Sequence, residues 1–442
     1  MADAKRFNWP LLALAIGAFG IGTTEFTPMG LLPVIAEGVH VSIPSAGLLI
    51  SAYAIGVMVG APVMTLAFSR FGKRSALMML MAIFTVGNLL SAVAPGYTTL
   101  LLARLVTSLN HGAFFGLGSI VAASVVLREK QASAVATMFM GLTIANIGGV
   151  PAATWIGQQI GWRMAFAGTA VLGVIAIASL WLALPRGEAG KLPDVRRELR
   201  VLMHPTVLLA LATTVMGAGA MFTLYTYVAP VLAELTGASG TFVTLGLVLI
   251  GVGFTIGNGL GGRLADWSLD GATKIFLAAL AVIMVALPLV LTSHVGAAIG
   301  LLVWGAATFP IVPPIQMRGM PGAAGAPRPA CPFIWVALRW VRTSLVGAVI
   351  GLRVGGAAPF AIVPPIQMRV MQAAAEAPGL ASSINVGAFN LGNALGAAVG
   401  GAVISLGLGY AAVPVAGGVL AAAGLLLALL GQKRVALQSC EA

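Results

Sequence analysis

Apolar runs of about 20 residues recur along the whole chain, and short polar segments separate them. A run of this length crosses the roughly 30 Å hydrocarbon layer of a bilayer as a helix. Apolar and polar positions do not alternate within the runs, which argues against the strands of a membrane barrel. The pattern therefore predicts an all-α polytopic membrane protein with twelve spans, at residues 10–33, 44–67, 75–95, 99–125, 134–158, 164–185, 207–231, 243–264, 274–292, 296–316, 380–405 and 410–431.

The composition supports this fold class. Hydrophobic residues make up 59% of the 442 positions and charged residues 8%, and the mean hydropathy is +1.01. A soluble domain does not have this balance. The first span has no small-residue cleavage site behind a short apolar core, so we expect it to be retained rather than removed as a signal peptide. Cys331 and Cys440 stand at no metal-ligand spacing and suggest no disulfide.

The basic residues behind the net charge of +12 lie on one side of the predicted membrane. The opposite loops offer Arg163. This positive-inside asymmetry predicts a multi-pass protein with both termini in the cytoplasm, and it argues against nucleic acid as the partner. The basic clusters are Lys5 and Arg6; Arg70, Lys73 and Arg74; Arg128 and Lys130; Arg186, Lys191, Arg196, Arg197 and Arg200; Arg263 and Lys274; and Lys433 and Arg434.

A charged segment at 186–206 divides the chain into two halves, 1–185 and 207–431, and residues 432–442 form a cytoplasmic tail. The halves look related, because "PVIAE" at 33–37 matches "PVLAE" at 230–234. Internal repeats of this kind are typical of secondary transporters, which bind their cargo between the repeats near the midplane. We therefore expect 186–206 to be a cytoplasmic linker between two six-span halves.

A second repeat lies within the C-terminal half. The segment 292–318 returns as 343–369, from "TSHVGAAIG" to "IVPPIQMR" in the first copy and from "TSLVGAVIG" to "IVPPIQMR" in the second. We interpret 319–369 as an extra duplicated segment between spans ten and eleven. Because the second copy carries Arg353, we expect the first copy to serve as span ten. A local scrambling of the sequence by frameshifts remains the alternative.

Four motifs resemble the major facilitator superfamily. They are "SRFGKRSA" at 69–76 and "GGRLADWSLDG" at 261–271 in repeat-related loops, "LLLARLVTSLNHGAFFGLG" at 100–118 in span four, and "GLTIANIGGVPAATWIGQQIGWR" at 141–163 in span five. Together with "GTTEF" at 22–26, they are similar to the twelve-span bacterial drug:proton antiporters, including the arabinose-efflux, chloramphenicol-efflux and purine-efflux permeases. The resemblance implies the major facilitator fold, with two six-helix halves around a central cavity. It implies as well that the membrane is the bacterial inner membrane.

The resemblance also implies a cytoplasmic gating loop in each half. Ser69 stands where the family has Asp, and Val150-Pro151 replaces the usual Gly-Pro pair of span five. Alternatively, the basic residues of the first loop serve as topology anchors alone. The positions that match the loop signature are Arg70, Gly72, Lys73, Arg74, Gly262 and Asp266.

Glu25 is the only acid between Asp3 and Glu37, and the apolar stretch before it carries it deep into span one. With a rise of 1.5 Å per residue, Glu25 lies roughly 12 Å inside the far boundary, and Arg104 enters span four at a similar depth. A lone carboxylate in hydrocarbon is costly, so pairing or protonation is expected. Dehydration favours the protonated carboxyl and a guanidinium favours the ionised one, so a site that is alternately wet and dry can load and release a proton.

We therefore expect Glu25 to carry the proton, Arg104 to be its electrostatic partner, and His111, about two turns deeper, to be a further coupling residue. For Glu25 the alternatives are a permanent interhelical salt bridge or a carboxyl that caps a broken helix. For Arg104 the alternative is a purely architectural role, and for His111 it is ordinary hydrogen bonding to neighbouring hydroxyls or backbone. Large or polar faces suggest cavity-wall residues, although each could also be simple helix packing. These candidates are Phe114, Phe115, Asn146, Tyr225, Tyr227, Asn385, Asn390 and Asn393.

The function that follows is proton-coupled efflux of small, mainly apolar or amphipathic compounds by alternating access. Export of a sugar or purine metabolite is an alternative, favoured if amides outnumber aromatic residues on the cavity wall, and a non-transporting membrane sensor is a third. The sequence has no nucleotide-binding loop and no metal-ligand cluster, so we expect no enzyme, cofactor or metal. The expected partners are a small-molecule substrate, protons and the lipid bilayer, and we expect a monomer.

Overall fold

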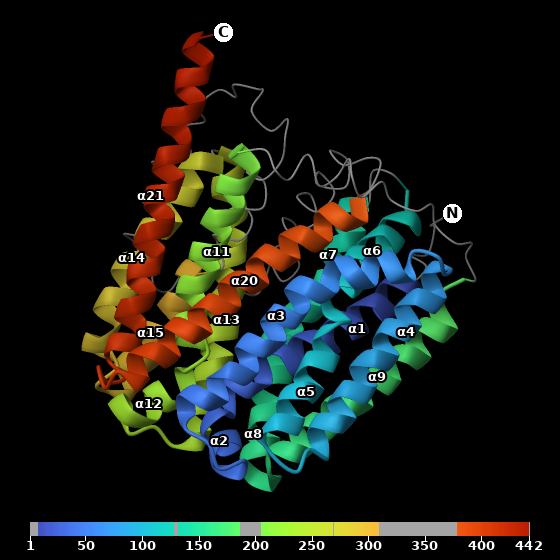
Figure 1. The fold of residues 1–442 in the computed structure, drawn as a ribbon, viewed down its shortest axis with the longest axis horizontal. Helices are drawn as coiled ribbons and strands as arrows, with labels where there is room; N and C mark the ends of the chain where they lie inside the picture. The colour runs from blue at the N-terminus through green and yellow to red at the C-terminus, as the bar shows by residue number, and fades with distance from the viewer. Residues whose placement is uncertain (1–7, 128–130, 186–204, 268, 309–377, 442) are drawn as a thin grey trace, which may run out of the picture.

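The computed structural model describes residues 8–127, 131–185, 205–267, 269–308 and 378–441. The N-terminal part of this fold is all-helical (Figure 1). Short connections such as 39–42 and 93–96 join neighbouring helices, so consecutive spans run in opposite directions. The helices are α1 Trp9–Gly30, α2 Leu32–Gly38, α3 Ile43–Phe68, α4 Lys73–Ala92, α5 Tyr97–Ser108, α6 His111–Ser124, α7 Gln131–Ile144, the π-helical turn η2 Ala145–Gly149, α8 Val150–Ile160 and α9 Trp162–Ala183.

The C-terminal part is helical as well. Its last helix continues through residues 432–441, which the sequence assigns to a tail. The helices are α11 Pro205–Tyr225, α12 Val228–Thr236, α13 Gly240–Trp267, α14 Leu269–Val290, α15 His294–Thr308, α20 Pro378–Ser405 and α21 Ala412–Glu441. The predicted linker up to residue 204 and the duplicated segment 319–369 lie outside the described residues.

The predicted spans correspond to helices in the described part of the chain. Ten helices there are long and apolar enough to cross a membrane, and the bent pair α11 and α12 adds an eleventh candidate. The predicted span 296–316 is represented by the shorter apolar helix α15, which is described as far as Thr308. The protein is therefore a multi-pass membrane protein. Exposed apolar side chains such as Val282 and Leu289, at 69% and 79%, give α14 a face suited to lipid.

The same packing arrangement occurs twice along the chain. In the N-terminal part α1 packs on α7 and α9, and α4 packs on α9. In the C-terminal part α11 packs on α20 and α21, and α14 packs on α21. Between the two parts, α20 packs along α3 (Figure 1). Helix α13 packs on α8 and on the π-helical turn η2. This repeated packing agrees with the internal repeat suggested by the matching "PVIAE" and "PVLAE" segments.

Four predicted spans are irregular near their middle or their far end. The first is interrupted at Leu31, the fourth between Ser108 and His111, and the seventh bends by 48° between Tyr225 and Val228. The fifth contains the π-helical turn Ala145–Gly149. Irregular backbone inside a membrane is tolerated where protein or a water-filled space surrounds it, and it often marks a functional site. Glu25 precedes the first break by six residues, and His111, Asn146 and Tyr225 lie at the other three.

Candidate functional site

Glu25 lies on α1 and is 4% exposed. Three residues further on, Pro28 is inside the same helix. Proline has no backbone N–H, so it cannot donate to the carbonyl of Thr24 four residues earlier. That carbonyl instead accepts a hydrogen bond of 3.1 Å from Nη1 of Arg104. The break in the hydrogen-bond ladder of α1 thus supplies an anchor for a buried cation.

Arg104 comes from α5 and is 1% exposed. Its guanidinium carbon lies 4.2 Å from the ring centroid of Tyr53 and 5.7 Å from that of Phe166, which are distances for cation–π attraction. Nε and Nη2 have no hydrogen-bond acceptor among the described residues. The aromatic faces and one main-chain carbonyl therefore surround this charge. We predicted Arg104 as the partner of Glu25, and the structure places its hydrogen bond on the adjacent residue, Thr24.

The acid's close partner in the described part of the chain is His111. Its Nε2 lies 3.9 Å from Oε2 of Glu25. His111 is the first residue of α6, and its Nδ1 lies 3.1 Å from the hydroxyl of Tyr53. Arg104 and His111 lie on either side of the break in the fourth span, and they contact α1 at Thr24 and at Glu25. The three predicted coupling residues thus meet around one position of α1, and their role in coupling stays a prediction.

A buried polar cluster adjoins this site, and sequence reasoning missed it. Thr24 of α1 and Thr169 of α9 both donate to Oδ1 of Asn88 on α4, the latter at 3.0 Å. Nδ2 of Asn88 donates to the carbonyl of Phe84 at 2.9 Å, and the side chain is fully buried. An amide in the middle of the apolar run of α4 was the signal available in the sequence. The cluster joins three helices at the level of the Arg104 anchor.

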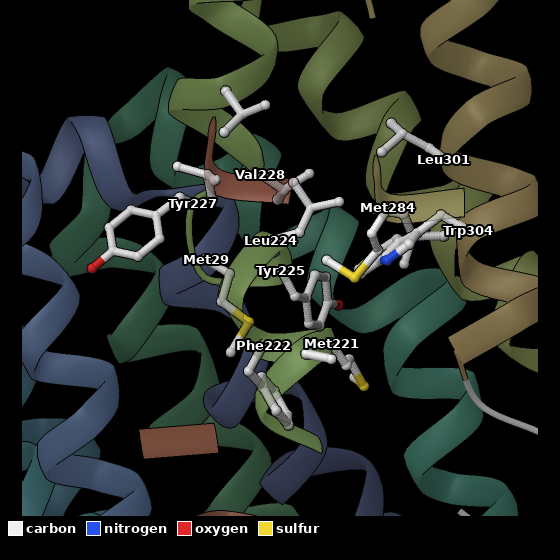
Figure 2. Close-up of a cluster of buried hydrophobic side chains, with 14 of the residues drawn as sticks. Met29, Met221, Phe222, Leu224, Tyr225, Tyr227, Val228, Met284, Leu301 and Trp304 are labelled. Carbon is white, nitrogen blue, oxygen red and sulfur yellow. The ribbon is translucent and has the colours of Figure 1, made fainter. Parts of the chain in front are cut away.

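Aromatic side chains surround the broken seventh span. Tyr225 lies 5.6 Å from Phe26, 5.6 Å from Phe254 and 6.1 Å from Trp304, measured between ring centroids. Its hydroxyl donates to Oδ1 of Asn146 in the π-helical turn, at 3.3 Å. Figure 2 shows Tyr225 and Trp304 within one buried cluster together with Met29, Met221 and Phe222. Phe26, Phe254 and Trp304 were not among the predicted residues, because only the tertiary fold brings their spans together.

Tyr227 points in a different direction from Tyr225 (Figure 2). Its hydroxyl donates to the carbonyl of Ala397 on α20, at 2.8 Å. A Cβ added at Gly47 of α3 would lie 2.1 Å from this hydroxyl oxygen, and one added at Gly401 of α20 would lie 2.6 Å from it. Glycine at both positions therefore leaves room for the tyrosine where the N-terminal and C-terminal parts meet.

The other predicted cavity residues lie in several places. Phe114 packs against Gly17 of α1, and Phe115 stacks on Phe139 at 5.0 Å and contacts His111 at 5.2 Å. Asn390 and Asn393 are buried on α20, and Oδ1 of the first and both amide atoms of the second find no partner among the described residues. The side chain of Asn385 lies outside the described residues. Contact of any of them with cargo stays a prediction.

The first predicted gating loop lies at the junction of α3 and α4. Arg70 is exposed, Gly72 precedes α4, and Lys73 begins it. Arg74 lies over the ring of Trp181 on α9, 5.8 Å from its centroid. Gly262 and Asp266 fall within α13, where side chains are outside the described set, so a charge pair between the two loops stays a prediction.

The duplicated bundle, the broken spans and the buried ionisable site together define a secondary transporter. Residues 14–326 match the family profile of the Major Facilitator Superfamily, and the chain belongs to that family. It is a transporter of the inner-membrane type and not an enzyme. It is 60% identical over 429 residues to the inner membrane transport protein YdhP of Escherichia coli K12, covering 97% of each chain.

The chain is also similar to more distant proteins. The chain is 29% identical over 423 residues to a chloramphenicol resistance protein of Streptomyces lividans, covering 95% of each chain. Among solved structures, it is similar to the partially occluded inward-open xylose transporter XylE of E. coli. The TM-score is 0.63 and the sequence identity 15%, over 96% of this chain and 97% of that one. This likeness establishes the fold alone.

Proposed function

We propose that the chain is a proton-coupled exporter of small, mainly apolar or amphipathic compounds, with Glu25 as the proton carrier. The observation that carries the proposal is the burial of Glu25 next to His111, at 3.9 Å, on a helix whose proline anchors Arg104. A buried carboxyl with a nearby base and a fixed cation has two accessible protonation states, since the environment offsets part of the cost of either. The proposed orientation has both termini in the cytoplasm of the bacterial inner membrane.

The side chains around the broken seventh span support an apolar cargo. Phe26, Phe222, Tyr225, Phe254 and Trp304 form a continuous series of ring contacts there. Transport sites for sugars need several polar groups, because each hydroxyl of the cargo loses water on binding. Aromatic residues outnumber amides at this position, so sugar or purine-metabolite export is the weaker alternative. The name of the chloramphenicol resistance protein of S. lividans agrees with a drug-type cargo.

Glu25→Gln tests the proposal directly. Glutamine keeps the size and hydrogen-bonding capacity of the carboxyl and cannot exchange a proton. We expect the purified variant in vesicles to lose uphill efflux of ethidium or chloramphenicol driven by a pH gradient, by more than about tenfold, which corresponds to about 1.4 kcal/mol. Downhill exchange of the same probe should remain.

The matched control is Glu37→Gln, which removes an exposed acid at the end of α2. It should leave efflux unchanged. Gradient-driven efflux by the Glu25→Gln protein at the normal rate would refute the assignment of the proton carrier. A panel of drugs and metabolites, tested in cells with and without the gene, would identify the cargo class.

A further inference from the structure

Tyr53 contacts both ionisable neighbours of the Glu25 site, and it does so with different parts of its side chain. Its ring face lies 4.2 Å from the guanidinium carbon of Arg104. Its hydroxyl lies 3.1 Å from Nδ1 of His111. Tyr53 is 1% exposed and sits in the middle of α3, so this hydroxyl has little access to water as an alternative partner.

The hydroxyl contact matters because a neutral histidine carries its hydrogen on one of two ring nitrogens. The hydrogen bond made by one nitrogen decides whether the other carries the hydrogen. If Tyr53 donates its hydroxyl hydrogen to Nδ1, the neutral imidazole carries its own hydrogen on Nε2. That nitrogen is the atom 3.9 Å from Oε2 of Glu25. The N–H dipole is then directed at the carboxyl, where it stabilises the ionised form more than the protonated form.

We propose that Tyr53 is a positioning residue of the proton-coupling site. Its hydroxyl holds the imidazole of His111 with the Nε2 hydrogen turned toward Glu25, and it thereby sets how tightly the acid holds its proton. This inference rests on the proposed function, because it assigns Tyr53 a part in tuning the same carboxyl. The other ionisable groups near Glu25 are Arg104 on α5 and Tyr225 on α11.

Tyr53→Phe separates the two contacts. The phenylalanine ring keeps its face against Arg104, while the hydroxyl at Nδ1 of His111 is lost. The readout is the protonation of Glu25 itself, followed by infrared titration of the carboxyl band in lipid nanodiscs, with the spectrum of Glu25→Gln subtracted. We expect Glu25 in the variant to hold its proton about threefold more tightly, since the ionised form loses a dipole contact worth a fraction of a hydrogen bond.

Tyr97→Phe is the matched control. It also removes one tyrosine hydroxyl from the N-terminal part, where the hydroxyl donates to the carbonyl of Ser45 at 2.8 Å. In this control, Glu25 should titrate at the same pH as in the wild-type protein. In a His111→Gln background, Tyr53→Phe should have no further effect, because Tyr53 acts through the imidazole.

Two results would overturn the proposal. One is a Glu25 titration in Tyr53→Phe that is the same as in the wild type. The other is a shift of the Glu25 titration by Tyr53→Phe that is equally large with His111 present and in the His111→Gln background. Should Tyr53→Phe not fold, nitrogen-15 NMR of the wild-type histidines decides, with His111→Gln giving the assignment, because the proposal requires the hydrogen on Nε2. All these measurements are made without cargo, so they stay informative if gradient-driven efflux is absent and the proposed function fails.

Discussion

At the scale of single residues, the site is organised by hydrogen bonds to backbone and amide groups more than by ion pairs. Arg104 bonds the carbonyl that Pro28 leaves free, and Asn88 collects the hydroxyls of Thr24 and Thr169. Inside a membrane each such group lacks water as a competitor, so an unsatisfied partner is costly. The residues around Glu25 therefore also stabilise the fold.

Asn88→Leu should destabilise the protein by about 1–3 kcal/mol, because it removes the acceptor of the buried Thr24 hydroxyl, whereas the Thr169 hydroxyl keeps the carbonyl of Phe166, at 2.8 Å, as a second acceptor. Thermal unfolding of the purified protein in detergent measures this. Adding Thr24→Val to Asn88→Leu should recover part of the loss, since removal of both partners costs less than removal of one. An unfolding temperature equal to that of the wild type in the single variant would show that the cluster does not stabilise the fold.

Sequence reasoning reached part of this site. Counting residues along apolar runs placed Glu25 and Arg104 at a similar depth and His111 about two turns deeper. The structure brings all three together around α1, with His111 next to Glu25, and their depth in a bilayer stays a prediction. The acceptor of Arg104 was missed, although Pro28 in span one was the available signal. The contact of Tyr53 with His111 could not be predicted, because the two residues are far apart in the sequence. The residues around Tyr53 do not show whether its hydroxyl bonds a histidine or its ring only packs.

At the scale of elements, close approach between helices depends on small residues. A Cβ added at Gly141 of α7 would lie 2.0 Å from the carbonyl oxygen of Ala15 on α1. This contact is to backbone, which cannot move aside as a flexible side chain can. Transmembrane helices use such glycines to bring their main chains together.

Gly141→Ala should therefore separate α1 from α7 and destabilise the protein by about 1–3 kcal/mol, in the range of other overpacked sites. Gly168→Ala on α9 is the matched control, since an added Cβ there meets nothing within 4 Å. Thermal unfolding of both variants in the same detergent makes the comparison. Equal stability of the two would refute the close α1–α7 contact.

The sequence predicted the positions of the spans but not their interruptions. Hydropathy averages over a whole span, so the breaks at Leu31, between Ser108 and His111, and between Tyr225 and Val228 do not end the apolar runs that contain them. The aromatic cluster was missed for a related reason. Its members come from spans one, seven, eight and ten, so the pattern exists only after the helices have packed.

At the scale of the whole molecule, the contact of α3 with α20 joins the N-terminal and C-terminal parts, and Tyr227 lies within it. The tyrosine fits only because Gly47 and Gly401 have no side chain. Alternating access requires contacts of this kind to form and break as the two parts rock. Overpacking there should favour separation of the parts.

Gly47→Ala should shift the population toward a more open arrangement at this end of the bundle. Spin labels at Glu37 on α2 and Glu234 on α12, exposed and equivalent in the repeat, can report the distance by pulsed electron resonance. Cys331 and Cys440 would be replaced by serine. We expect a longer-distance component in Gly47→Ala and none in Gly168→Ala. Identical distance distributions would mean that Tyr227 does not hold the parts together.

The proline in the first helix has a final consequence. The Arg104 guanidinium is hydrogen-bonded to a main-chain carbonyl, so its position does not depend on an ion pair that would be lost when Glu25 is protonated. In this arrangement Arg104 is held without an ion pair to Glu25, so on the proposed function the net charge of the site changes as Glu25 gains or loses a proton. Among related sequences, Pro28 and Arg104 are therefore expected to be kept or lost together, independently of Glu25.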